Sequence, residues 1–147
     1  MFRFIPRIAA VLLVVVAATL APAAAEERQL TGSGAGFVLG GSLQGGGQAT
    51  HLGRSALYVP LYTDFLGSGL FLPFGGSLEA ANGDALYFVF DEEAYYFDPA
   101  IGVVSTTVTF TGGTGRFKDV TGSAVVMVDF TPDFYHFEFL IDGTIDY

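Results

Sequence analysis

The chain has 147 residues, of which 51% are hydrophobic, and its formal net charge is −9 at pH 7. This charge argues against nucleic acid as a partner, because phosphate binding needs clustered Lys and Arg. The chain contains no cysteine, which excludes disulfide bonds and a thiol nucleophile and leaves burial and backbone hydrogen bonds to stabilise the fold.

The N-terminal segment 1–25 has the pattern of a secretory signal peptide. Arg3 and Arg7 precede an apolar run over 8–20, and Ala23–Ala25 fits a small-x-small cleavage site. The run of 13 residues is shorter than the roughly 20 that a membrane-spanning helix needs. All 15 acidic residues but only four of the six basic ones follow residue 25, so the mature chain carries a formal charge of −11. We expect a secreted or periplasmic protein with one domain over 26–147.

Beyond the signal segment, apolar residues recur at every second position between glycines, which is typical of strands, and no segment has a helical period. The first expected strands are 30–39 and 48–58, with the glycine-rich Gly40–Gly47 as the loop between them. The apolar segment 61–73 is a lid, a plug or a further strand.

Two more strands are expected on either side of a strong turn signal. Asn82-Gly83-Asp84 separates 76–81 from 85–90. The acidic cluster of Asp91-Glu92-Glu93 and Asp98 follows. It lacks the ligand order of a calcium loop, so a hydrated hairpin end is the better interpretation. We expect neither a metal nor a cofactor.

The C-terminal part alternates most clearly. In 104–111 and 124–130 the apolar residues share one face, and 134–145 continues the pattern. About eight strands without a helix predict an all-β fold, a closed antiparallel eight-stranded barrel, because closure removes exposed strand edges. A two-sheet sandwich would give the same pattern.

The most distinctive stretch is the glycine corner over Thr111–Ser123. Glycine supplies backbone angles there that other residues avoid. The corner contains Gly112, Gly113, Gly115, Phe117 and Gly122.

This corner resembles that of the allene oxide cyclase and dirigent barrels. The segments 49–54 and 142–147 look like parts of small exported bacterial proteins with the same barrel. The resemblance implies an eight-stranded barrel, often a trimer, around an apolar cavity. Characterised relatives cyclise an unsaturated fatty-acid epoxide or steer phenoxy-radical coupling. No active-site residue of the cyclase maps onto a matching position here.

The weak catalytic candidates are His51, Arg54 and Glu138. Histidine can exchange protons near neutral pH, and we expect His51 on a strand that reaches the cavity mouth. Glu138 lies two residues after His136 and so on the same strand face, although a solvated pair on the outside is the simpler interpretation. There is no Gly-x-Ser-x-Gly elbow.

Three functions remain open. The leading one is a soluble exported barrel whose apolar interior binds a small hydrophobic molecule, since eight strands can enclose one small ligand or be filled by side chains. The second is an isomerase or cyclase acting on such a molecule. The third is a small outer-membrane barrel or a structural protein without a cavity. We expect a homo-oligomer, a trimer, with contacts around Val125, Met127, Tyr135 and Phe139.

Overall fold

The computed structural model describes residues 26–63, 71–94, 96–98 and 100–147. Within these ranges the chain forms strands and two short 3₁₀ helices, and no helix there is long and apolar enough to cross a membrane. The elements are β1 (Arg28–Leu39), β2 (Ser42–Ala49), β3 (Gly53–Thr63), β4 (Phe71–Pro73), β5 (Gly75–Ala80), β6 (Ala85–Phe90), η1 (Glu92–Ala94), β7 (Tyr96–Asp98), β8 (Val103–Gly113), η2 (Gly115–Phe117), β9 (Thr121–Phe130) and β10 (His136–Asp146).

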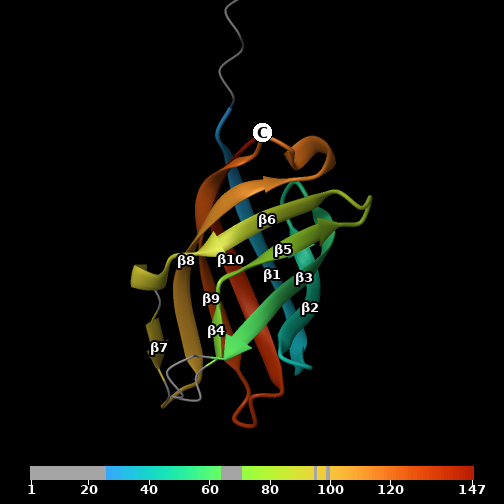
Figure 1. Cartoon of the computed structure of the whole chain (residues 1–147). Coiled ribbons are helices and arrows are strands. Elements are labelled where there is room, and N and C mark those ends of the chain that lie inside the picture. The colour runs from blue at the N-terminus through green and yellow to red at the C-terminus, as the bar shows by residue number, and fades with distance from the viewer. Residues whose placement is uncertain (1–25, 64–70, 95, 99) are drawn as a thin grey trace, which may run out of the picture.

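Eight of the strands close into an antiparallel barrel (Figure 1). The order around the wall is β1-β2-β3-β5-β6-β8-β9-β10, and β10 pairs again with β1. The short β4 and β7 pair with β3 and β8 outside this circuit. The predicted all-β, eight-stranded closed barrel is confirmed, and the sandwich alternative is wrong because no edge separates two sheets.

The two ends of the barrel differ, and Figure 1 shows them at the top and the bottom. The corner end holds η2, the β2–β3 turn and the β5–β6 turn. The opposite end holds the β1–β2 turn, β4, β7 and the β9–β10 turn. Of the apolar segment 61–73, residues 61–63 belong to β3 and 71–73 form β4, while 64–70 lie outside the described residues, as does the expected signal peptide.

The glycine-rich segment expected as a loop is instead strand β2. It pairs along its whole length with β1 and β3. Gly45 faces inward, and a Cβ there would come within 3.3 Å of Cζ of Phe137. A side chain at Gly45 would meet both this ring from β10 and the carbonyl oxygen of Ala35 on β1, which lies 2.8 Å from the Cβ position. The β1–β2 turn is only Gly40–Gly41, and the β2–β3 turn lies at 50–52, which places His51 in a turn rather than on a strand.

Candidate functional site in the interior and on the outer wall

The barrel interior is filled by apolar side chains. Twelve of them surround a central void of only about 20 Å³, which is close to the size of one water molecule. Phe88, Phe110 and Phe139 contribute rings to this lining. A pocket for a drug-sized ligand usually measures several hundred Å³, so these side chains leave no room for such a ligand unless they move.

The interior offers no group for acid–base chemistry. Among the described residues, the buried polar side chains are those of Ser42 and Thr106. The Ser42 hydroxyl donates to the carbonyl of Leu39 at 2.8 Å, and the Thr106 hydroxyl lies 3.4 Å from the carbonyl of Thr107. Neither ionises near neutral pH, and the ionisable side chains of the described residues remain at least partly exposed.

The glycine corner seals one end of the barrel. Phe117 is fully buried there and packs against the ring of Tyr147, with ring centroids 5.0 Å apart. The side-chain oxygen of Thr114 accepts the backbone N–H of Ala85 at 2.8 Å. Arg116 forms an ion pair with Asp84, Nε to Oδ2, at 3.7 Å. The corner thus ties η2 to the β5–β6 turn and closes the interior from this side.

The glycines of the corner adopt unusual backbone angles. Gly112, Gly115 and Gly122 have φ of +134°, +57° and +127°. Gly113 does not have a positive φ, but a Cβ there would come within 2.9 Å of Cβ of Phe117. These residues have a structural role in the corner, and none of them carries a reactive side chain.

His51 belongs to the same end. Its Nε2 lies 3.0 Å from the carbonyl oxygen of Gln29, and its own carbonyl accepts a hydrogen bond from Nη2 of Arg116. Its ring contacts Tyr147, and its backbone has φ of +67°. These contacts hold His51 in the turn, on the outside of the sealed end.

The three catalytic candidates do not form one site. Arg54 lies on the outer face of β3, and Glu138 lies on the outer face of β10, opposite Asp129 of β9. Strands β2 and β1 separate β3 from β10 in the wall. Neither these side chains nor His51 is buried in the interior.

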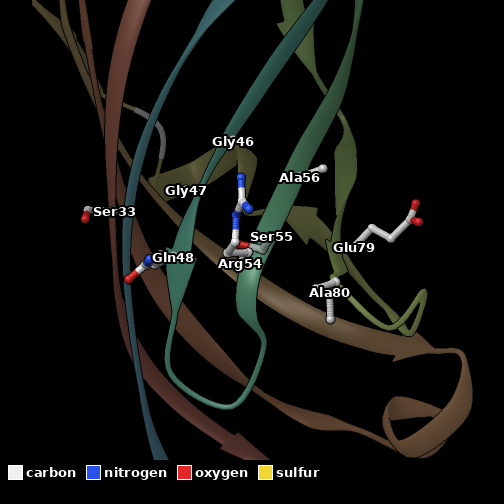
Figure 2. A pocket seen from close by; sticks show the side chains of 10 residues that line it. Ser33, Gly46, Gly47, Gln48, Arg54, Ser55, Ala56, Glu79 and Ala80 are labelled. Carbon is white, nitrogen blue, oxygen red and sulfur yellow. The ribbon is translucent and has the colours of Figure 1, made fainter.

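A shallow hollow of about 740 Å³ lies on the outer wall over β1, β2, β3 and β5 (Figure 2). Gly46 and Ala56 face each other across β2 and β3 at its floor. Arg54 stands over these strands in Figure 2, whereas Glu79 on β5 points away from them. We call this feature the outer hollow. Sequence reasoning missed it, although small residues at outward positions of neighbouring strands were its signal.

Beside the hollow, the wall carries an apolar patch formed by Val125 and Met127 of β9 and Leu140 of β10. Their side chains are about half exposed, and Met127 and Leu140 are cross-strand partners. Tyr135 is also exposed, in the β9–β10 turn. Phe139, grouped with these residues from the sequence, points inward and is buried. The reason is strand parity, since Phe139 pairs with the inward-facing Val128.

Two carboxylates of the acidic cluster accept hydrogen bonds from the backbone of their own turns. Asp91 accepts the backbone N–H of Glu93 at 3.0 Å, and Asp98 accepts that of Ala100 at 2.9 Å. Within the part of the chain that the structure describes, no three His, Cys, Asp or Glu side chains gather as a metal site.

The chain matches no known protein family, no curated protein and no solved structure.

Proposed function

We propose that the protein is an exported, homo-oligomeric β-barrel that works by binding through its outer surface. The observation that carries this proposal is the filled interior, where apolar side chains leave a void of about 20 Å³. Catalysis finds no support there, because the buried polar side chains of the described residues are only the hydroxyls of Ser42 and Thr106. We therefore place binding on the outer wall, which carries both an apolar patch and a hollow.

These two surfaces complement each other in charge. The patch of Val125, Met127 and Leu140 is apolar and about half exposed, and the outer hollow has a floor of small residues. Glu138 borders the patch, and Arg54 borders the hollow. A patch docked into the hollow of a second copy would bring Glu138 and Arg54 together. Such head-to-tail contacts close into rings, and a trimer is the ring that the resemblance to the cyclase barrels implies.

Light scattering on the chain 26–147 tests this assembly. We expect a trimer that Leu140→Asp converts to monomers. Arg54→Glu and Glu138→Arg should each weaken the trimer, and the double variant should restore it, because the charges are then exchanged. Thr109→Asp, on the exposed outer face of β8, is the matched control and should remain trimeric. A monomer for the unaltered chain would overturn the proposal.

A second candidate function is binding of a small hydrophobic molecule inside the barrel. The observation in its favour is that the side chains around the central void are all apolar. Aromatic side chains would have to change rotamer to admit a ligand. An isomerase or cyclase would use the same interior site and would act by positioning its substrate.

Fluorescent fatty acids of several chain lengths test the second candidate. Saturable binding that an unlabelled fatty acid displaces would support it. The matched variant is Val126→Phe, which adds volume at the inner wall beside the void and should abolish such binding. An unaltered barrel that binds no fatty acid would overturn it and leave the outer-surface function.

An outer-membrane barrel is the least supported reading. Such barrels direct apolar residues to lipid and polar ones to the lumen. Here every second residue of β9 and β10 is apolar and buried in the interior, and the outer face carries Asp129, Glu138 and Asp142 beside the patch of Val125, Met127 and Leu140.

A further inference from the structure

The end of the barrel opposite the glycine corner carries a rim of exposed apolar side chains. Figure 1 shows this end at the bottom, where β4, β7 and the β9–β10 turn lie. We call the following residues the apolar rim: Phe37, Leu39, Phe74, Tyr96, Ile101 and the pair Phe134–Tyr135. Three of them, Tyr96, Ile101 and Tyr135, are 63–65% exposed, which is more than any large apolar side chain on the outer wall.

The β9–β10 turn holds its part of the rim in a fixed shape. The backbone N–H of Phe134 donates to the carbonyl of Thr131 at 2.8 Å, and that of Tyr135 donates to Asp133 at 3.0 Å. The Thr131 hydroxyl also donates to Asp133, at 2.5 Å. Because the turn is hydrogen-bonded in this way, the apolar tips are presented without further ordering, which lowers the entropic cost of binding.

The corner end has the contrasting character. Its exposed side chains include Arg116, Lys118 and Asp119. The large apolar side chains there, such as Phe117 and Val120, are buried. Of the two ends of the described barrel, the exposed large apolar side chains therefore gather at one. An apolar surface gathered at one end marks a binding face more clearly than scattered exposed residues do.

The charges around the rim restrict what can cover it. Asp98 and Asp129 lie beside Val103 at the start of β8, Asp133 lies in the β9–β10 turn, and none of the three is buried. The Lys and Arg residues of the described chain lie elsewhere, on β1 and β3 near their starts and in the corner, and His136 stacks on Phe37 at this end. A second copy docked end to end would bring two sets of carboxylates together. An anionic surface would also be repelled. The complementary partner has an apolar layer beneath outward-facing positive groups.

We propose that the apolar rim docks the protein onto the surface of a zwitterionic phospholipid bilayer. The side chains of the rim enter the boundary between head groups and acyl chains, as interfacial anchors do. The carboxylates face the ammonium groups of the lipid, and the aromatic rings add cation–π contacts with them. This docking goes beyond the proposed function and does not depend on it, because it uses an end of the barrel and leaves the side wall free for other copies.

Sedimentation with lipid vesicles tests the docking. The protein is the chain 26–147, which contains every strand of the closed barrel, and the vesicles are phosphatidylcholine alone or an equal mixture with phosphatidylglycerol. We expect sedimentation with phosphatidylcholine and weaker binding to the anionic mixture. Ile101→Ser and Tyr135→Ser should each lower the partition coefficient about tenfold, from the apolar area withdrawn.

Tyr87→Ser is the matched control, because Tyr87 is an exposed tyrosine on the side wall. It should leave vesicle binding unchanged, and thermal melts should show that all three variants are folded. Failure of the folded chain to bind phosphatidylcholine vesicles would overturn the proposal, as would stronger binding to the anionic mixture or an equal loss in Tyr87→Ser. If the rim variants instead dissociate an oligomer in light scattering, the rim binds a second copy and the proposal is wrong. The Arg54 and Glu138 variants test the side-wall assembly separately.

Discussion

Gly34 of β1 and Phe139 of β10 are cross-strand partners that both face the barrel interior. A Cβ at Gly34 would come within 2.6 Å of Cζ of the Phe139 ring. The ring therefore occupies the volume that a side chain on β1 would fill. The interior is packed by combining large aromatic side chains on β10 with glycines on β1 and β2. The glycines leave space for the rings.

Gly34→Ala should destabilise the barrel by about 1–3 kcal/mol, the usual range for overpacking a closed core. The added methyl group meets both the Phe139 ring and the backbone of Gly46. Gly46→Ala is the control, because its nearest neighbour would lie 3.7 Å away, at an ordinary contact distance. Urea denaturation measures both changes. Equal stability of the two variants would contradict this account of the packing.

Phe139→Ala should cost about 3–5 kcal/mol of unfolding free energy, because it removes a buried ring and leaves a cavity. The existing void of about 20 Å³ lies beside this ring, so the two spaces would merge. Urea denaturation gives the stability, and a binding assay with benzene tests the cavity, since apolar cavities of this kind take up such probes. A loss below 1 kcal/mol would mean that the wall collapses onto the space.

The sequence was sufficient to predict the barrel where alternation is carried by side chains. Val104, Val108 and Phe110 were expected on one face of a strand, and they line or approach the core. Period two encodes the facing of a strand directly. The same reasoning failed for β2, because two of its inward positions are Gly45 and Gly47. Their close neighbours are the backbone of β1 and, at Gly45, the ring of Phe137, far away in the chain.

The candidate site was less predictable for a related reason. The sequence predicts that Glu138 shares a strand face with His136, but the positions of Arg54 and Glu138 in the wall depend on strand order and register. His51 was expected on a strand, whereas its carbonyl and ring belong to a turn that Arg116 and Tyr147 help to hold. Such contacts join residues remote in sequence, so no local pattern records them.

Gly115→Val should lower the melting temperature more than substitution of any charged residue. Gly115 has φ of +57°, a conformation that costs other residues about 1–2 kcal/mol. A Cβ there would also collide with the carboxylate of Asp84. Thermal melts of Gly115→Val and of Lys118→Ala, an exposed neighbour, make the comparison. If the two melts coincide, the corner is an ordinary loop.

The β9–β10 turn should lose stability in acid. The hydrogen bond from the Thr131 hydroxyl, and then that from the backbone N–H of Tyr135, lower the pKa of Asp133 below its ordinary value. A carboxyl group with a lowered pKa in the folded state stabilises the fold above its unfolded pKa, about 4. This contribution disappears as the pH falls through the lowered folded value.

Thr131→Val removes the hydroxyl, so the pKa of Asp133 should rise and the pH dependence of unfolding below about pH 4 should become shallower. NMR titration of the Asp133 carboxyl, beside urea denaturation across the same pH range, measures both effects. An unchanged pKa in Thr131→Val would show that the Thr131 hydroxyl does not control this carboxylate.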